Sequence, residues 1–498
     1  MTNGTRVSTV DGVLRRSAAK FPDRPAVTFE GRSHSYRELD TAVTRVARRL
    51  IAMGLDKGDR VAAYGVNSDA YVVAFLACAR AGLVHVPINY ALVGDELLYL
   101  LDQSGARAVL VDPELSNTLD SVRSGTAVEF VVSLPDLLDP AGDDSVLEPA
   151  ADSADLAQLL YTSGTTSKPK GAMMSHGALV AEYVSCVIAL GFTEDDDPLL
   201  VMPMYHSAGM HVFMLPYLSV GATVRLMRKP DVAEILRRIE DEKIKSLFLA
   251  PTVWVPLANH PDLDSRNLSS LKKAQYGSSI MPVTVLTRLR ERYPDIEFYN
   301  CFGQSEIGPL ATVLQPSEHE ARPASCGRAV FFVETRVVDA DGNDVPDGEP
   351  GEILYRSPQL CDGYWDKPEA TADAFSGGWF HSGDLVTRDA EGFITVVDRI
   401  KDVINTGGIL VASREVEDAI YTHPAVAEVA VIGTPDDKWI EAVTAVVVLK
   451  DGSEVSAQEL IDHVKGRIAP FKVPKTVTFL DELPRNQSGK LLKRALRA

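Results

Sequence analysis

Cysteine and basic residues are both scarce in this sequence. Its five cysteines are scattered over 498 residues and none forms a C-x-x-C pair, so neither a disulfide framework nor a zinc site is indicated. We therefore expect a reducing compartment. Lys and Arg number 50 against 69 Asp and Glu, and the net charge of −19 argues against a surface that binds nucleic acid or anionic membranes.

Long apolar runs are also missing. The most apolar stretches, Ala70–Ala79 and Val212–Val224, are too short to span a bilayer, and the first residues lack the apolar core of a secretory signal. We expect a cytoplasmic protein with at most peripheral membrane contact. Because 498 residues exceed one compact core, several structural units are expected.

Most of the chain alternates helical and strand patterns, which indicates βαβ units and mostly parallel sheets. In residues 1–150 the pattern predicts helices at Tyr36–Met53 and Ala70–Ala81, and strands at Arg60–Tyr64, Val84–Pro87 and Ala108–Val111. In residues 151–326 it predicts strands at Ala157–Tyr161, Leu199–Pro203 and Ser246–Ala250, and helices at His176–Leu190 and Thr284–Arg292. Two sheets with helices around them follow from this order.

The texture changes after residue 326. Residues 327–398 are rich in β pattern and turn residues, with strands expected at Val330–Val338, Gly351–Tyr355 and Phe393–Val397, and they predict a small antiparallel barrel or sheet. Residues 402–498 predict a smaller α+β unit, with helices at Arg414–Tyr421 and Ala457–Ile468 and strands at Val426–Ile432 and Ala442–Val448. The short polar stretch between them is a reasonable domain junction.

One loop combines many groups that bind phosphate. Thr162-Ser-Gly-Thr-Thr-Ser-Lys-Pro-Lys170 follows a predicted strand and precedes a predicted helix. Glycine lets backbone N–H groups approach an anion, hydroxyls donate hydrogen bonds, and lysine supplies charge. The spacing is not that of a P-loop, and an ordinary Ser/Thr/Gly loop is the alternative.

The loop resembles the signature of the adenylate-forming (ANL) superfamily, in particular the AMP-dependent acyl-CoA synthetases and fatty-acid–CoA ligases. Further stretches resemble that family's motifs in the same order: Tyr276-Gly-Ser-Ser-Ile-Met-Pro282, Tyr299-Asn-Cys-Phe-Gly-Gln-Ser-Glu306, Trp379-Phe-His-Ser-Gly-Asp384, Asp398-Arg-Ile-Lys-Asp402 with Asn405-Thr-Gly-Gly408, and Pro484-Arg-Asn-Gln-Ser-Gly-Lys490. The resemblance implies an α/β fold with a large N-terminal domain of two αβαβα-type sheets and a small β-barrel. It also implies a smaller mobile α+β C-terminal domain. We expect these domains at 1–398 and 402–498, with a hinge at 399–401.

The resemblance implies an ATP, Mg²⁺ and coenzyme A site. Glu306 and Thr162 would hold the metal, and Lys490, Glu306 and His206 would be catalytic. The residues implied to bind ATP or AMP are Thr162, Ser163, Gly164, Thr165, Thr166, Lys170, Ser278, Ser279, Asn300, Phe302, Gly303, Gln304, Ser305, Asp384 and Arg399. Chemically, Phe302 can stack on adenine, Ser305 can donate to the α-phosphate, and Asp384 can accept from the ribose hydroxyls.

The remaining implied positions concern the acid, the thiol and the hinge. Lys401 would be the hinge residue, and Gly407, Gly408, Phe471 and Lys475 would contact coenzyme A. The acyl pocket would include Tyr205, His211, Gly277 and Gly308. Packing in the core is an equal alternative for His211, and a core position is also an alternative to a gate role for His206.

The implied reaction activates a carboxylic acid with ATP to an acyl-adenylate and then transfers the acyl group to coenzyme A. Gly277, Ser278 and Ser279 are small, which favours a medium- or long-chain fatty acid, with an aryl acid second. Ile409 and Leu410 depart from the family's Glu-Asn after the Gly-Gly pair and put the details of thioester formation in doubt.

Several alternatives stay open. They are transfer to a carrier protein, an inactive nucleotide-binding relative, and a serine hydrolase. The hydrolase is the weakest alternative, because Ile307 replaces the second glycine of the G-x-S-x-G motif. The partners are then the acid, ATP and coenzyme A, and a homodimer is left open.

Overall fold

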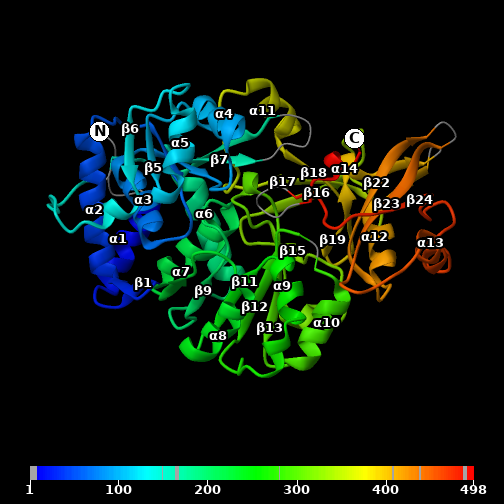
Figure 1. Cartoon of the computed structure of the whole chain (residues 1–498). Helices are drawn as coiled ribbons and strands as arrows, with labels where there is room; N and C mark the ends of the chain where they lie inside the picture. Colours follow the sequence, from blue (N-terminus) through cyan, green and yellow to red (C-terminus); the bar gives the residue numbers. More distant parts are fainter. Residues whose placement is uncertain are drawn as a thin grey trace. The chain divides into compact units, whose positions relative to one another are not determined.

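The computed structural model of the chain describes residues 8–148, 150–162, 168–279, 281–406, 409–436, 439–485 and 491–497. Contacts within the chain divide it into two compact units. The first comprises residues 1–334 with 355–380, and the second comprises residues 335–354 with 381–498. Figure 1 shows the whole chain coloured along the sequence.

The first unit contains two sheets, and the smaller has six described strands in the order β6-β5-β3-β4-β7-β8. It is parallel except for the antiparallel pair β7–β8. Its strands are β3 (Arg60–Tyr64), β4 (Val84–Ile88), β5 (Ala108–Val111), β6 (Phe130–Ser133), β7 (Leu156–Thr162) and β8 (Lys170–Ser175). The phosphate-loop residues that the structure leaves undescribed, 163–167, therefore connect two paired strands.

The larger sheet of the first unit has nine strands among the described residues, in the order β15-β14-β13-β12-β11-β9-β10-β1-β2. Its interior strands are parallel, while β2, β14 and β15 are antiparallel to their neighbours. The strands are β1 (Pro25–Phe29), β2 (Arg32–Ser35), β9 (Pro198–Leu200), β10 (Val224–Leu226), β11 (Ser246–Leu249), β12 (Lys273–Gly277), β13 (Glu297–Phe302), β14 (Thr312–Leu314) and β15 (Arg328–Ala329). Strands from both ends of the unit thus share one sheet.

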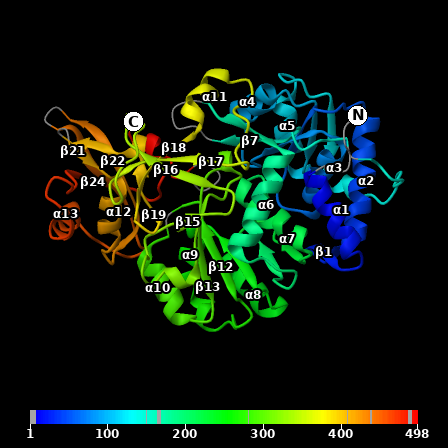
Figure 2. The ribbon, with the colours of Figure 1, turned by 180° about the vertical axis from the view of Figure 1, so that it is seen from behind.

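Helices form three layers around these sheets (Figures 1 and 2). Helix α3 (Asp69–Ala81) lies between the sheets, in contact with β1 and with β3 and β4. Its layer also contains α1 (Val10–Lys20), α2 (Tyr36–Ala52), α6 (His176–Leu190) and α7 (Leu215–Val220). The outer layers are α4 (Gly94–Ser104) with α5 (Ser116–Arg123) on the smaller sheet, and α8 (Val232–Glu242), α9 (Pro251–Ala258) and α10 (Val283–Arg292) on the larger. Helix α11 (Pro368–Ala374) completes the unit.

The sequence of α3 explains its central position. Ser68 caps the helix by accepting from the Tyr71 backbone N–H at 3.1 Å, and Gly82 ends it with a left-handed φ of 70°. All thirteen residues of the helix are buried. A helix that is buried on every face is stable only where other elements cover it completely, as the two sheets and the neighbouring helices α1 and α2 do here.

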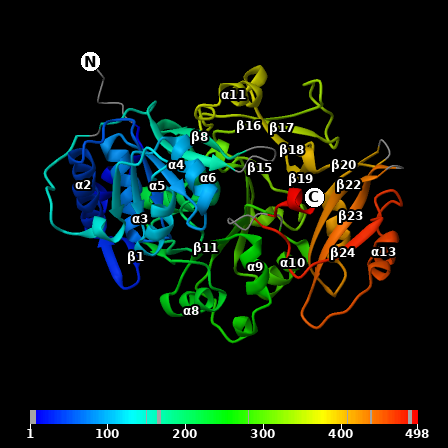
Figure 3. The same ribbon diagram turned by 45° about the horizontal axis from the view of Figure 1, so that its top comes forward.

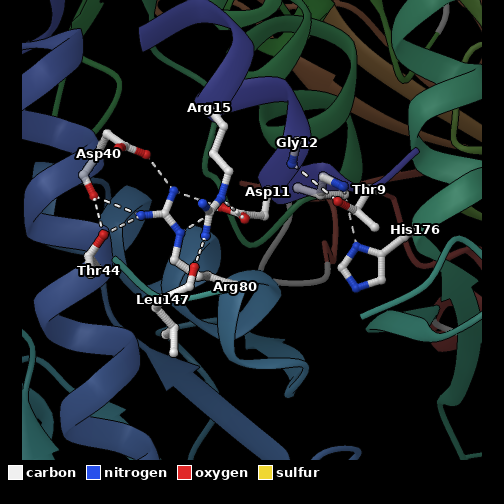
Figure 4. Close-up of polar contacts among 10 residues, drawn as sticks. Thr9, Asp11, Gly12, Arg15, Asp40, Thr44, Arg80, Leu147 and His176 are labelled. Carbon is white, nitrogen blue, oxygen red and sulfur yellow. Dashed lines mark hydrogen bonds and ion pairs between the residues drawn. The ribbon is translucent and has the colours of Figure 1, made fainter. Parts of the chain in front are cut away.

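Several charged residues are buried inside this helical layer, and the largest of them is Arg80. Arg80 of α3 has a side chain that is 1% exposed, and Figure 4 shows its guanidinium between α1 and α2. It bonds Asp11 from Nε at 2.8 Å and from Nη2 at 2.7 Å, and it reaches the Asp40 carbonyl at 2.8 Å and the Thr44 hydroxyl at 2.6 Å. The Asp40 carboxylate accepts the fifth N–H, and Arg15 contacts Asp11 from the other side at 2.6 Å. The cluster joins three helices by their side chains.

The second unit contains two further sheets. A four-stranded one has the order β16-β17-β18-β19, from β16 (Glu334–Val338), β17 (Gly351–Arg356), β18 (Phe380–Arg388) and β19 (Ile394–Arg399). A five-stranded one contains β20 (Ile404–Thr406), β21 (Ile409–Val411), β22 (Val426–Asp436), β23 (Ile440–Leu449) and β24 (Thr476–Phe479). Helices α12 (Ser413–Tyr421) and α13 (Ala457–Lys465) pack beside it, with α13 next to β24 in Figure 3, and α14 (Lys493–Leu496) lies near the chain end.

The predicted fold class is confirmed: the chain is α/β with a larger N-terminal and a smaller C-terminal part. Three details differ from the sequence expectations. The phosphate loop leads into strand β8 and not directly into a helix, β1 and β2 were not predicted, and the β-rich segment is a sheet whose described strands do not close into a barrel. Within the described residues, no helix is both long and apolar enough to cross a membrane.

Candidate active site

The phosphate-loop strands meet an acidic residue from a distant part of the first unit. Thr162 ends β7 and pairs with Lys170 at the start of β8. The Thr162 hydroxyl donates to Glu306 Oε1 at 2.9 Å, and the Tyr364 hydroxyl donates to the same oxygen at 3.1 Å. The Lys170 ammonium lies 4.9 Å from the centre of the Tyr364 ring. The structure therefore brings together Thr162, Lys170 and Glu306, which the sequence had grouped, and adds Tyr364, which it had not.

Glu306 has the environment of a carboxylate that meets a hard cation. It is 7% exposed, and the hydrogen bonds that the structure describes for its side chain both end on Oε1. Among the described residues, neither Glu306 nor any other position belongs to a group of three or more His, Cys, Asp or Glu side chains that could hold a metal ion. A single carboxylate fits Mg²⁺ because this ion is usually held by one or two carboxylates together with substrate phosphates and water.

The carboxyl ends of β12 and β13 supply the next group of residues. These parallel strands are in register, with Tyr276 opposite Asn300 and Gly277 opposite Cys301. Ser278 and Ser279 follow β12, and Phe302 ends β13, so all lie at one edge of the sheet, where ligands bind in open α/β sheets. Asn300 is already used in part, because its amide donates to the Ser325 carbonyl at 2.9 Å.

The segment after Phe302 is closely packed. A Cβ on Gly303, whose φ is +154°, would lie 2.0 Å from the Pro309 carbonyl oxygen, so only glycine fits there. Ser305 begins the short helix η5 (Ser305–Ile307), and its hydroxyl lies 2.9 Å from the Ser207 hydroxyl. Ser207 directly follows His206, the predicted gate residue. His206 is therefore next in sequence to the residue that contacts Ser305, which is proposed to bind the α-phosphate.

Asp384 and Arg399 form a pair in the second unit. They lie directly opposite each other on the antiparallel strands β18 and β19, and Arg399 Nε is 2.5 Å from Asp384 Oδ1. The Asp384 side chain is 3% exposed and that of Arg399 is 32% exposed. Strand register therefore brings two residues fifteen positions apart into contact, while their predicted role at the ribose stays a prediction.

The predicted coenzyme A and hinge residues also lie in the second unit. Lys401 is in the short helix η8 (Ile400–Asp402). Phe471 is half-buried against the core of the C-terminal sheet, and the Lys475 ammonium lies 5.5 Å from the centre of the Trp439 ring. Gly407, Gly408, Ser163, Gly164, Thr165, Thr166 and the proposed catalytic Lys490 lie outside the described residues.

His211 is placed in the interior of the first unit. It lies in the π-helical segment η3 (Ala208–Met214) and is fully buried. Its ring nitrogens contact the Tyr183 hydroxyl at 3.0 Å and Gln158 Oε1 at 2.6 Å. Burial lowers the pKa of His211 to about 3, so the ring is neutral near pH 7. Both nitrogens are engaged within the protein, which favours the core-packing alternative over a role in the acyl pocket.

The other acyl-pocket candidates have mixed surroundings. Tyr205 is half-buried, and its ring packs edge-on against Tyr90 with centroids 5.6 Å apart. A Cβ on Gly277 would lie 2.2 Å from the Cys301 carbonyl oxygen, so glycine is required by the neighbouring strand. A Cβ on Gly308, whose φ is +105°, would lie 2.9 Å from Glu182 Oε2. Packing against β13 therefore accounts for the glycine at position 277, and no acyl tail is needed to explain it.

Two family models match the chain. The AMP-binding enzyme model matches residues 14–365, and the AMP-binding enzyme C-terminal domain model matches residues 415–490. The two matches together contain the phosphate loop, the Glu306 segment and Lys490.

Known relatives extend over nearly the whole chain. Feruloyl-CoA synthase of an Amycolatopsis species is 38% identical over 482 residues, which cover 97% of each chain. The medium/long-chain-fatty-acid–CoA ligase of Mycobacterium tuberculosis is 33% identical over 525 residues, covering 99% of this chain and 90% of that one. Among solved structures, o-succinylbenzoate CoA synthetase from Bacillus subtilis in complex with its acyl-adenylate intermediate has a TM-score of 0.90 at 30% identity, covering 99% of this chain and 98% of that one.

Proposed function

This chain belongs to the family of AMP-binding enzymes and is an AMP-forming acid–CoA ligase, and from this premise we propose that the acid it activates is aromatic. The observation that carries the proposal is the higher identity to feruloyl-CoA synthase than to the fatty-acid–CoA ligase. The structure also weakens the argument for a fatty acid. A side chain at position 277 would clash with the Cys301 carbonyl oxygen on β13, and this clash alone accounts for the glycine.

The proposed reaction has two steps that balance without a redox partner. A carboxylate oxygen of the acid attacks the α-phosphorus of ATP, and the bond to pyrophosphate breaks. The thiol of coenzyme A then attacks the acyl carbon, its proton passes to solvent, and AMP leaves with the oxygen that the acid contributed. Positioning and charge neutralisation carry most of the catalysis, since no protein group needs to become covalently attached.

The first unit supplies the residues that meet the triphosphate. We assign the phosphates to Thr162, Lys170 and the undescribed loop between them, and the α-phosphate to Ser305. Glu306 and Thr162 would hold Mg²⁺, which neutralises phosphate charge when bound. The oxygen Glu306 Oε1 is oriented by two hydroxyl donors, and this keeps the carboxylate fixed before the nucleotide arrives.

The second unit supplies groups that act on the ribose and the thiol. We assign the ribose hydroxyls to Asp384, which Arg399 orients, and coenzyme A to the region of Phe471 and Lys475. Lys490 remains the proposed bridge between the acid and the phosphates during the first step. The boundaries 1–398 and 402–498 with a hinge at Lys401 remain proposals as well.

The proposal is tested by measuring coenzyme A thioester formation with a panel of acids. The panel contains ferulate, cinnamate, benzoate and indoleacetate against octanoate, decanoate and palmitate. We expect kcat/KM for the best aromatic acid to exceed that for the best fatty acid by at least about tenfold, the smallest factor expected when a pocket discriminates by shape. Comparable values for decanoate would overturn the aromatic assignment and leave the ligase reaction intact.

Transfer to a carrier protein in addition to coenzyme A is the further acceptor reaction to test, because the first half-reaction is the same for either thiol. The same assay with a holo-carrier protein in place of coenzyme A separates the two. A Glu306→Gln variant is the control, and it should lose acid-dependent pyrophosphate release with every acid and either acceptor.

A further inference from the structure

A carboxylate is sealed into the core directly behind the proposed metal-binding loop. Glu182, on α6, is fully buried, and none of its described hydrogen-bond donors is cationic. Its Oε1 accepts from the Leu310 backbone N–H at 2.9 Å and from the Cys186 thiol at 3.3 Å, and its Oε2 accepts from the Gln359 amide. Burial raises the pKa of Glu182 to about 8. Such a group is costly to bury, so its position needs a reason beyond packing.

Gln359 is held in one orientation by the same surroundings. Its Nε2 donates to Glu182 and lies 3.0 Å from the carbonyl oxygens of Ile307 and Leu310. Its Oε1 accepts from the Ser185 hydroxyl. A flipped amide would put an oxygen against two carbonyls that cannot donate, so the nitrogen must face the loop.

These two side chains satisfy the backbone of the loop that follows η5. Between Ile307 and Leu310 they occupy two carbonyl oxygens and one N–H, and the Glu182 carboxylate packs against Gly308 where a Cβ would be. The loop has no strand partner there, and buried backbone groups without partners are destabilising. Glu182 and Gln359 therefore provide the backbone hydrogen bonds that a neighbouring strand or helix would otherwise provide.

The residues of the same loop that are proposed to meet Mg²⁺ and the α-phosphate, Glu306 and Ser305, contact other parts of the unit. The Glu306 carbonyl accepts from the Cys361 N–H at 2.8 Å, two residues after Gln359. The Glu306 side chain meets Thr162 and Tyr364, and Ser305 meets Ser207. A shift of the backbone at 307–310 would thus move the groups assigned to Mg²⁺ and to the α-phosphate.

We propose that Glu182 and Gln359 are positioning residues that fix the Ser305–Leu310 loop, and through it the place of Ser305 and Glu306 during adenylation. The inference rests on the proposed function of Glu306, and it assigns neither residue a contact with substrate. Loss of the pair would loosen the loop and weaken the binding of Mg²⁺ with ATP.

The test is acid-dependent ATP–pyrophosphate exchange as a function of Mg²⁺ concentration, in the full chain, and hydrogen–deuterium exchange of residues 305–310 in the metal-free chain is a second readout that does not depend on turnover. Gln359→Met removes the donor while keeping the length of the side chain, and Glu182→Gln turns an acceptor into a donor that faces another donor. We expect each to raise the Mg²⁺ concentration for half-maximal exchange by about 10- to 100-fold, the range for changes to partners of metal ligands. The double variant should be no worse than the poorer single variant, because the two residues act on one loop.

The matched control is Tyr183→Phe on the same helix. Tyr183 is equally buried and also loses a hydrogen bond, but its partner is His211 and not the loop. This variant should lose stability without a change in the Mg²⁺ requirement. If Glu182→Gln fails to fold, Ser185→Ala removes only the bond that orients Gln359, and a smaller shift in the same direction is expected.

The possible outcomes separate the inference from the proposed function. An unchanged Mg²⁺ requirement in Gln359→Met, with normal folding, overturns the positioning role. A shift of equal size in Tyr183→Phe does so as well, since it would then reflect general loss of stability. Absence of exchange in the unmodified chain with every acid of the panel instead overturns the proposed function.

Discussion

Replacing Arg80 by methionine should loosen the helical layer between the two sheets of the first unit. Methionine fills most of the space of the arginine stem but leaves four hydrogen bonds and the ion pair with Asp11 unmade. Asp11, whose side chain is 1% exposed, then retains only Arg15 as a charged partner, and Asp40, which is 33% exposed, can be rehydrated. The uncompensated charge therefore falls mainly on Asp11, at the start of α1.

The cost follows from the burial of the pair. Removing one partner of a buried ion pair typically costs about 3–5 kcal/mol, because the other charge stays buried. We expect about 3 kcal/mol for Arg80→Met, at the lower end, because Arg15 still contacts Asp11 at 2.6 Å. Adding Asp11→Asn to Arg80→Met removes the buried charge and should restore part of the loss.

Hydrogen–deuterium exchange of the full chain measures this loss of stability for α1 and α2 separately from the rest of the chain. Amides of α1 and α2 should exchange faster in Arg80→Met, by a factor that corresponds to the predicted free energy. Arg15→Met is the control, since Arg15 is 30% exposed and its loss should cost about 1 kcal/mol or less. A loss of protection below about 1 kcal/mol in Arg80→Met, or no recovery in the double variant, would refute the reasoning.

Two further predictions concern the active-site region. The pKa of Glu182 is raised to about 8 from 4.5, so the folded protein binds this proton more tightly; its contribution to stability is complete below pH 4.5 and is lost as the pH rises through 8. Thermal unfolding across this range should show a fall in melting temperature that is weaker in Glu182→Gln, and an equal fall in both proteins contradicts the assignment. Asp384→Asn should weaken ATP binding by about tenfold, as expected for loss of about 1.4 kcal/mol of hydrogen bonding to the ribose; a titration with a fluorescent ATP analogue tests this, and unchanged affinity would remove Asp384 from the ribose site.

The regular parts of the fold were readable from the sequence. The strand Arg60–Tyr64 and the helix His176–Leu190 have the predicted bounds, because apolar runs between turn residues define them locally. Strand β2 was missed since Arg32–Ser35 is polar and pairs only as an edge hairpin with β1. Strand β8 was missed because only Lys170 of Lys170–Ser175 belongs to the predicted phosphate loop, the residues after it were assigned to no element, and the pairing with β7 has no local signature.

The site was predictable as motifs but not as an arrangement. The resemblance to the adenylate-forming family grouped Thr162 with Glu306, and the structure places the two side chains in hydrogen-bond contact, while their role at Mg²⁺ stays a prediction. Tyr364, Glu182 and Gln359 were not found, since each acts by a contact with residues more than fifty positions away and lies in no recognisable motif. A buried polar residue on an otherwise apolar helix is the one signal that could have marked Glu182.

The order of strands in the larger sheet determines when that sheet can form during synthesis. Val27 of β1 pairs with Val224 of β10, 197 residues later, whereas the six-stranded sheet is assembled entirely from residues 60–175. At about 5–20 residues per second, a ribosome needs about 10–40 s to make the intervening chain. The hairpin of β1 and β2 therefore emerges long before its partner exists, and the sheet that it caps is completed only after the other has had time to fold.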